Sequence, residues 1–223
     1  MQVWTLFLRQ ISGAVKYTLL TLPELYYEQN RTHQLRLFKR LFCLVLLGST
    51  TLSVAHAEPN TWILIDVAER SLLVMQDDQV IEDYAGISLG RNGYAADRSE
   101  GDGKTPLGEF HVAWVNPKSR FRYFFGLDYP NIERAELAYQ RNRIDTNTYS
   151  EIRRAFSNGK VPPQTTALGG YIGIHGIGSG DPRIHKISDW TQGCIALTNA
   201  QLDGLQKWIK VGTRVVITDG LNS

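Results

Sequence analysis

The chain has 223 residues, and its composition, 43% hydrophobic and 21% charged, is ordinary for a globular protein. The formal net charge is +2, but residues 1–57 hold six Lys or Arg and two Glu, a balance of +4, so the remaining residues carry −2. A nearly neutral body without a basic run argues against nucleic acid as a partner.

Features of a secretion signal explain the basic N-terminal segment. Lys39 and Arg40 precede an apolar run over residues 41–54, which has the length of a signal-peptide core and is short for a bilayer span. A small-residue motif of the A-x-A type, typical of signal-peptide cleavage sites, ends at Ala57. The pattern predicts export, with cleavage after Ala57.

These signals divide the chain into a leader over residues 1–57 and a mature protein over residues 58–223, which we expect in the periplasm. Within the leader, residues 38–57 would be the signal peptide, and an overlong gene start would explain residues 1–37. The alternative is an apolar run that stays uncleaved as an N-terminal anchor. With cleavage, the protein contacts a membrane only through its leader.

Export changes how the cysteines are interpreted. The chain holds two, Cys43 in the predicted leader and Cys194, so the mature protein would have one thiol and no internal disulfide. An exposed lone thiol in an oxidising compartment is a chemical liability unless it has a function. Cys194 is therefore predicted to be reactive or to pair between molecules. The competing expectation is a buried, inert cysteine.

The first half of the predicted mature chain is rich in short apolar runs separated by turns, which is typical of a β-meander. We expect strands over residues 62–67, 71–75, 80–89 and 110–115. Residues 91–106, before the last of these strands, are rich in Gly and Asp and are expected to form a loop.

Residues 131–158 change character. They have apolar residues at helical spacing and no glycine, which predicts one or two helices inserted into a β-rich body. This insertion carries five arginines, which would either form a lid whose cations meet substrate carboxylates or belong to a solvated helix face. They are Arg134, Arg141, Arg143, Arg153 and Arg154.

After the insertion the chain returns to a strand, expected over residues 171–175. Thr198 or Asn199 can cap a later helix that would run from residue 200 to about residue 210, and residues 214–218 would form a final strand. The sequence therefore predicts a β-rich α+β fold with a helical insertion and one late helix.

Cys194 and His175 have the neighbours that catalysis by a thiol needs: a base, and backbone N–H groups for a developing oxyanion. His175 ends a predicted strand just before Gly176, so its imidazole is expected at the rim of a sheet. Gly193 lacks a side chain, which lets backbone amides approach a substrate carbonyl. The spacing of 19 residues between His175 and Cys194 allows a loop that leaves and returns, which would place both at neighbouring strand ends.

Four segments in chain order, GDGKTPLGEF, IGIHG, TQGCIAL and VGTRVVI, resemble motifs of the L,D-transpeptidase catalytic domain (YkuD-type). The corresponding family patterns are GxxxTPxGxF, HG, S/T-x-G-C and GTxVxI. Each segment is weak alone, but four in the right order behind a signal peptide are specific. The resemblance covers nearly all of the predicted mature chain, and it implies a β-sandwich of the L,D-transpeptidase type over residues 58–223.

The resemblance also implies an activity. The family acts on peptidoglycan stem peptides and cuts the bond between the L-centre of diaminopimelate and the following D-Ala. By that resemblance Cys194 would attack the carbonyl and form a thioester, and His175 would be the general acid and base. The backbone amides of Gly193 and Cys194 would bind the oxyanion, and Thr191 would take the place of the motif Ser. No metal or cofactor is implied.

Two departures from the family pattern leave the fate of the thioester open. Ala196 stands where the family often has Arg or Asn, and Gln192 stands where it often has a small residue or His. The acyl group would pass either to an amine, as in a transpeptidase, or to water. Water would make the protein an L,D-carboxypeptidase or an amidase that releases a wall-attached lipoprotein. A third alternative is a peptidoglycan-binding module that has lost catalysis.

Other residues near the two motifs have competing roles. Gly176, Asp189 and Trp190 are candidates for substrate binding; Asp189 could instead orient the base, and Trp190 could be a core residue. His185 lies in the expected loop over residues 178–189. It would either contact substrate carboxylates or be a solvated loop residue.

A zinc site is a further alternative for this stretch. His175, His185 and Cys194 would supply three ligands, the number that a catalytic zinc needs. Their spacing of ten and nine residues matches no compact metal motif, and no carboxylate is clearly recruited. We therefore expect no metal.

Overall fold

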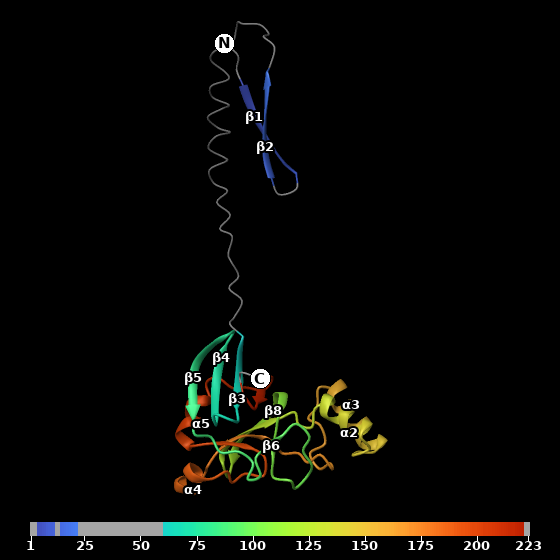
Figure 1. The fold of residues 1–223 in the computed structure, drawn as a ribbon, viewed down its shortest axis with the longest axis vertical. Helices are drawn as coiled ribbons and strands as arrows, with labels where there is room; N and C mark the ends of the chain where they lie inside the picture. Colours follow the sequence, from blue (N-terminus) through green and yellow to red (C-terminus); the bar gives the residue numbers. More distant parts are fainter. Residues whose placement is uncertain (1–3, 12–13, 22–59, 221–223) are drawn as a thin grey trace. The chain divides into compact units, whose positions relative to one another are not determined.

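The structure, a computed structural model, describes residues 4–11, 14–21 and 60–220. Strands β1 (Trp4–Ile11) and β2 (Ala14–Thr21) pair antiparallel as a separate two-stranded unit (Figure 1). The sequence predicts no strand there. The signal peptide, its cleavage site and Cys43 lie outside the described residues.

Residues 60–220 contain a mixed sheet of eight strands (Figure 1). The strands are β3 (Thr61–Asp66), β4 (Ser71–Gln76), β5 (Gln79–Ala85), β8 (Gly108–Ser119), β9 (Arg122–Leu127), β10 (Gly173–Gly176), β11 (Ile195–Leu197) and β12 (Arg214–Thr218). Their order across the sheet is β11-β10-β9-β8-β12-β3-β4-β5. The pairs β10–β11 and β3–β12 are parallel, and the others are antiparallel.

Strand β8 joins the two halves of this sheet. Its first residues, 108–111, pair with β12, and its later residues pair with β9. The register shifts after Val112 and again after Asn116, and such irregularities bend a strand and increase its twist. A bent β8 lets the half with β9, β10 and β11 turn toward the half with β12, β3, β4 and β5.

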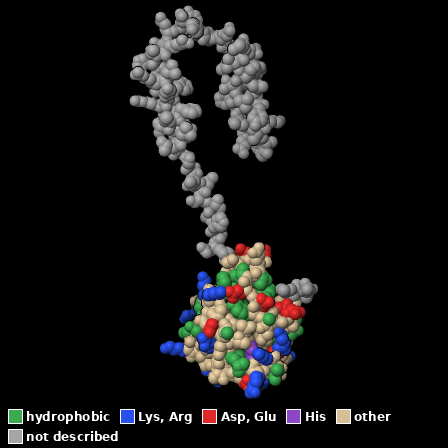
Figure 2. All heavy atoms as spheres, turned by 90° about the vertical axis from the view of Figure 1, so that its left-hand side faces the viewer, with side chains coloured by type: hydrophobic (Ala, Val, Ile, Leu, Met, Phe, Trp, Pro, Cys, Tyr) green, Lys and Arg blue, Asp and Glu red, His purple; other side chains and the backbone are tan. Residues whose placement is uncertain are grey.

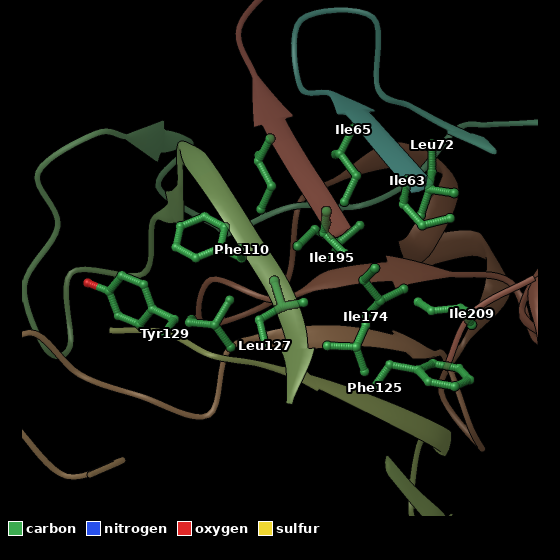
Figure 3. Close-up of a cluster of buried hydrophobic side chains, with 14 of the residues drawn as sticks. Ile63, Ile65, Leu72, Phe110, Phe125, Leu127, Tyr129, Ile174, Ile195 and Ile209 are labelled. Atoms are coloured by element: carbon green, nitrogen blue, oxygen red, sulfur yellow. The ribbon is translucent and has the colours of Figure 1, made fainter. Parts of the chain in front are cut away.

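The side chains of both halves meet in one core. Ile63 and Ile65 of β3 point toward Ile174 of β10 and Ile195 of β11, and all four are fully buried (Figure 3). Burying an isoleucine side chain contributes roughly 1.5–3 kcal/mol. This core identifies which faces of β10 and β11 look inward, and the opposite faces are left for other contacts. The β-rich fold expected from the sequence is confirmed.

The outer edge of β11 is covered by a segment that follows β5. Ser88 and Ala196 form an antiparallel bridge with reciprocal backbone hydrogen bonds of 2.9 and 2.8 Å. Gly90 and Thr191 pair in the same region, where the Arg91 N–H donates to the Thr191 carbonyl at 2.9 Å. An edge strand otherwise exposes unpaired backbone groups, so this segment fixes the end of the sheet.

Four helices complete the body: α2 (Ile132–Gln140), α3 (Thr146–Ser157), α4 (Pro182–Ile187) and α5 (Asn199–Leu205). Asn131 and Asp145 cap α2 and α3, and Thr198 caps α5 in a capping box with Gln201. None of the helices within the described residues is long and apolar enough to span a membrane. The face that carries α4, α5 and β5 mixes small apolar groups with Lys, Arg, Asp and Glu (Figure 2).

The predicted strands at residues 62–67, 71–75, 110–115 and 214–218 are confirmed as β3, β4, β8 and β12. The helical insertion is confirmed as α2 and α3.

Three expected elements are shorter in the structure. The strand expected over 80–89 ends at Ala85, because Gly86 takes a φ of 76°, far from the extended backbone of a strand interior. The strand expected from residue 171 begins at Gly173, since Tyr171 has a φ of 53°. The late helix ends at Leu205 instead of residue 210.

The insertion's arginines hold the preceding loop. Arg134 donates to the Ala96 carbonyl at 3.0 Å, and both Arg141 and Arg143 pair with Asp97. The three arginines are therefore engaged by this loop, although Arg141 stays 53% exposed, as a solvated helix face would leave it. A lid that meets substrate carboxylates stays a prediction. The three arginines tie α2 and the residues after it to the loop over residues 91–106, which also contains the short strands β6 (Tyr94–Ala95) and β7 (Thr105–Pro106).

Gly126 of β9 offers a test of packing beside the β10 edge. A Cβ there would overlap the Trp114 ring, which stacks on Phe124 at 5.0 Å. We expect Gly126→Ala to lower the free energy of unfolding by about 1–3 kcal/mol, measured by urea denaturation. Adding Trp114→Phe should recover part of that loss because the smaller ring relieves the overlap. Full stability of the single variant would contradict this packing.

Candidate active site

Parallel pairing of β10 and β11 places His175 and Cys194 on the same face of the sheet. His175 is opposite Ala196, and Ile174 is opposite Ile195. Side chains alternate between faces along a strand, so His175 and Ala196 share a face. Cys194 stands two residues before Ala196 and belongs to that face as well, as a diagonal neighbour of His175. The isoleucines on the other face enter the core.

The Cys194 thiol is half-buried and makes one hydrogen bond in this structure. Its Sγ donates to the Tyr171 carbonyl at 3.2 Å. Burial raises the pKa of Cys194 to about 11, although the Gly173 N–H and the Arg98 charge act in the opposite direction. At neutral pH Cys194 therefore rests as a protonated thiol.

His175 is set up as a neutral base. Its Nδ1 lies 2.7 Å from the Gly176 carbonyl, and since a carbonyl only accepts hydrogen bonds, Nδ1 carries the proton and Nε2 has a free lone pair. Burial lowers the pKa of His175 to about 4; the Gly176 carbonyl opposes this shift, whereas Arg120 and His185 add to it. The side chain is 2% exposed, so the expected position at a rim is wrong.

Aromatic rings enclose the imidazole. Phe121 stacks on His175 with ring centroids 4.4 Å apart, Phe124 lies at 5.9 Å, and Trp190 meets the ring edge-on at 5.7 Å. Phe124 lies on β9, and Phe121 immediately precedes that strand. Strand β9 was not predicted from the sequence. The aromatic run FRYFF was the available signal. These rings remove water from the base, which is the physical cause of its lowered pKa.

Thr191 and Gly193 form the turn that presents the nucleophile. The Thr191 hydroxyl donates to the Cys194 carbonyl at 2.7 Å and accepts from the Gly193 N–H at 3.0 Å. The Gly193 amide is thus already paired, contrary to the expectation that it is free for an oxyanion. Thr191 is buried, and its role in the structure is to shape this turn.

Gly193 is also where the loop over residues 91–106 meets the nucleophile turn. Its φ is 128°, and a Cβ there would lie 2.5 Å from the Lys104 carbonyl oxygen. Thr105, in the same loop, accepts a hydrogen bond from the Gly90 N–H at 2.9 Å. The segment GDGKTPLGEF therefore packs against the turn before Cys194, which explains why the two motifs occur together.

Asp189 does not orient the base. Both of its carboxylate oxygens bind the Arg70 guanidinium, at 2.6 and 2.7 Å, and one also accepts from the Leu89 N–H at 2.8 Å. The ion pair anchors the loop before Thr191 to the turn between β3 and β4, and the Leu89 contact anchors it to the segment after β5. Trp190, the next residue, packs against His175 as described. Gly176, which ends β10, is buried and could not carry a side chain without meeting Asn199.

The comparisons with known proteins agree with this architecture. The family model of the L,D-transpeptidase catalytic domain (YkuD) matches residues 60–217, more than half of the chain. The chain belongs to this family. No curated protein matches it.

Several solved structures are similar to this L,D-transpeptidase domain. Bd1075 of Bdellovibrio bacteriovorus is 21% identical, with 74% of this chain and 49% of that chain covered and a TM-score of 0.48. The helical cell shape determining protein Pgp2 of Campylobacter jejuni is 21% identical, with 73% and 48% covered and a TM-score of 0.48. An L,D-transpeptidase from Mycobacterium smegmatis is 14% identical, with 72% and 59% covered and a TM-score of 0.38. The match spans about half the length of the first two.

His185 is neither solvated nor in a loop. It belongs to α4 and is 4% exposed, with Nδ1 3.0 Å from Ser88 Oγ. The sequence analysis missed α4 because the helix has six residues and is flanked by a glycine-rich turn. No three His, Cys, Asp or Glu side chains of the described residues gather as metal ligands.

A cavity of about 440 Å³ lies beside the aromatic rings of this L,D-transpeptidase domain. Phe121 and Trp190, which both contact His175, line one part of it, and Arg120 and Ile184 line another. The lining is mainly apolar, with Arg120 and Asp181 as its charged residues.

The Gly193 turn predicts a sharp steric effect. Gly193→Ala combines a left-handed φ with a backbone clash, so we expect a loss of about 3 kcal/mol or more in the free energy of unfolding, measured by urea denaturation. Gly101→Ala is the matched control, because Gly101 has a φ of 75° and open space around it. The control should lose only about 1 kcal/mol. Equal losses would show that Lys104 does not press on this turn.

The resting thiol predicts a pH profile. With the pKa of Cys194 raised to about 11, the rate of Cys194 alkylation by iodoacetamide should rise about tenfold per pH unit from pH 7 to pH 10 without a plateau. The pKa of His175 near 4 means that no imidazolium is present there to stabilise a thiolate. A plateau below pH 8 would instead demonstrate a preformed thiolate–imidazolium pair.

Proposed function

We propose that this chain is a cysteine-dependent L,D-transpeptidase that acts on peptidoglycan stem peptides. It would cut the bond between the L-centre of diaminopimelate and D-Ala and transfer the acyl group to an amine. The observation that supports the proposal is the parallel pairing of β10 and β11, whose register sets His175 opposite Ala196, two residues after Cys194. Membership of the L,D-transpeptidase family supports the substrate class.

Acylation would begin with a proton transfer. In the resting protein the thiol proton of Cys194 is directed at the Tyr171 carbonyl. As Sγ attacks the carbonyl carbon of the substrate, this proton would pass to the free lone pair on Nε2 of His175. The carbonyl oxygen becomes an oxyanion. Because the Gly193 N–H already donates to Thr191, we assign the first oxyanion contact to the N–H of Cys194. The Gly193 N–H would contribute a second contact only after its hydrogen bond to Thr191 breaks.

Collapse of the tetrahedral intermediate would break the C–N bond. The imidazolium of His175 gives its proton to the departing D-Ala nitrogen, which leaves a thioester on Cys194 and a neutral imidazole. An acceptor amine then attacks the thioester, His175 takes its proton, and the thiol is regenerated as the new amide forms. His175 starts and ends each half-reaction unprotonated at Nε2, which agrees with its lowered pKa.

Transfer is favoured over hydrolysis by the surroundings of the base. Phe121, Phe124 and Trp190 enclose the imidazole, and the neighbouring cavity is mainly apolar. Apolar surroundings of this kind disfavour an ordered attacking water molecule and favour an acceptor amine that carries a side chain of its own. The apolar enclosure is therefore the reason for proposing a transpeptidase ahead of a carboxypeptidase or an amidase.

The leader predicted over residues 1–57 would deliver the enzyme to the periplasm, where peptidoglycan lies. Its cleavage after Ala57 would leave the body with one thiol. N-terminal sequencing of the protein recovered from the periplasm should begin at Glu58. Recovery only in the membrane fraction, with the leader attached, would contradict cleavage.

Product analysis tests the function directly. Purified protein incubated with tetrapeptide muropeptides should yield cross-linked dimers and free D-Ala, identified by mass spectrometry. Cys194→Ala should abolish both products, and His175→Ala should lower the rate by at least about a hundredfold. Substitution of the exposed His111, on β8, is the control and should change neither.

Other outcomes of the same assay separate the alternatives. Tripeptide without dimers would replace transfer by hydrolysis. With isolated wall that carries an attached lipoprotein as the substrate, release of that lipoprotein would identify an amidase. Binding to peptidoglycan with no product, unchanged in Cys194→Ala, would leave a binding module and overturn the enzymatic proposal.

A further inference from the structure

Helix α4 docks through its histidine. Ile184 and Ile187 of this helix are 50% and 82% exposed, whereas His185 between them is 4% exposed. A short helix ordinarily buries its apolar residues and leaves an imidazole in water. A buried imidazole is costly unless its nitrogens are hydrogen-bonded. In α4 the apolar side chains are exposed and the imidazole is buried, which indicates that the contacts of His185 determine how this helix packs against the domain.

The partners of His185 define its protonation. Trp190 Nε1 lies 3.4 Å from His185 Nδ1, and an indole nitrogen can only donate, so Nδ1 is an acceptor. Ser88 Oγ lies 3.0 Å from the same nitrogen and 3.0 Å from the His185 carbonyl, so its one hydroxyl proton is shared between these two acceptors. His185 therefore carries its proton on Nε2, a buried atom that has no hydrogen-bond partner within the described residues. Its burial lowers its pKa, which keeps this neutral form at neutral pH.

Both partners lead to the catalytic residues. The ring of Trp190 meets His175 edge-on at 5.7 Å. Ser88 forms two backbone hydrogen bonds with Ala196, which is directly opposite His175 in the β10–β11 pair. One imidazole thus contacts a residue that packs on the base and a residue that fixes the strand beside the base.

We propose that His185 is a positioning residue for His175. Its Nδ1 holds the indole of Trp190 against the catalytic imidazole, and its bond to Ser88 locks α4 to the segment that covers β11. This inference rests on the proposed role of His175 as the base. His185 touches neither the thiol nor the substrate in this account, and it acts through Trp190. Loss of the acceptor would let the indole rotate and the imidazole of His175 shift.

Three variants and one control separate positioning from bulk stability. His185→Asn keeps an acceptor oxygen close to the place of Nδ1, and His185→Leu removes it with similar volume. Trp190→Phe keeps a ring but removes the donor, so it tests the same bond from the other side. His111→Asn, at an exposed histidine 3.5 Å from Asp128, is the control.

The expected kinetic result is a loss in kcat with little change in KM. A base displaced by an ångström costs about a hundredfold, so His185→Leu should lower kcat by roughly ten- to a hundredfold while KM stays within about threefold. His185→Asn should restore kcat to within about fivefold of the parent. In the Trp190→Phe background, His185→Asn and His185→Leu should differ by less than about twofold, because the bond is already gone.

Two readouts do not depend on transpeptidase activity. The Hε1 resonance of His175 in NMR spectra should shift in His185→Leu and in Trp190→Phe, but not in His111→Asn. The rate of Cys194 alkylation at pH 8 should change in the same two variants. If the parent protein makes no product, the proposed function fails, and these two readouts still decide the positioning role.

Three results would overturn the proposal. One is a kcat in His185→Leu within twofold of the parent. Another is an equal loss in His185→Asn and His185→Leu, which would show a steric role only. The third is an unchanged His175 resonance in Trp190→Phe. If His185→Leu does not fold, the His175 resonance in Trp190→Phe, compared with the parent, still provides the third comparison.

Discussion

Parallel pairing of β10 with β11 is the contact on which the rest of the site depends. Ile174 and Ile195 lie opposite each other and are fully buried, so the register is fixed by the core and not by the catalytic residues. A slip of one residue would turn each side chain to the other face and send His175 inward. The hydrophobic core thereby determines where the thiol and the imidazole meet.

Two further constraints hold this pair in place. Ser88 covers the outer edge of β11 through its bridge to Ala196, and the GDGKTPLGEF loop packs on Gly193 through Lys104. Burial then determines the chemistry, since it raises the pKa of Cys194 to about 11 and lowers that of His175 to about 4. Both groups rest neutral, and charge would arise only when a substrate carbonyl is in place.

Sequence patterns predicted the parts of this molecule that depend on local periodicity. Local periodicity can be recognised within a single segment of sequence. This holds for the apolar runs of β3, β4 and β12 and for the helical spacing of the insertion. Strand β9 and helix α4 were not predicted, because their stability comes from contacts between residues far apart in the chain. Examples are the contact of Phe124 with His175 and that of Ser88 with His185. The His175 and Cys194 assignment came from motif order. The paired state of the Gly193 amide, the burial of both histidines and the Arg70 partner of Asp189 depend on distances that no spacing reveals.

The central claim is that Cys194 carries the acyl group between donor and acceptor. Rapid acid quenching of the protein with a tetrapeptide donor, followed by peptide mapping in a mass spectrometer, tests it most directly. We expect a tripeptide acyl adduct on the peptide that contains Cys194, removable by hydroxylamine as a thioester is. Product formation in Cys194→Ala, or an adduct located on any other residue, would contradict it.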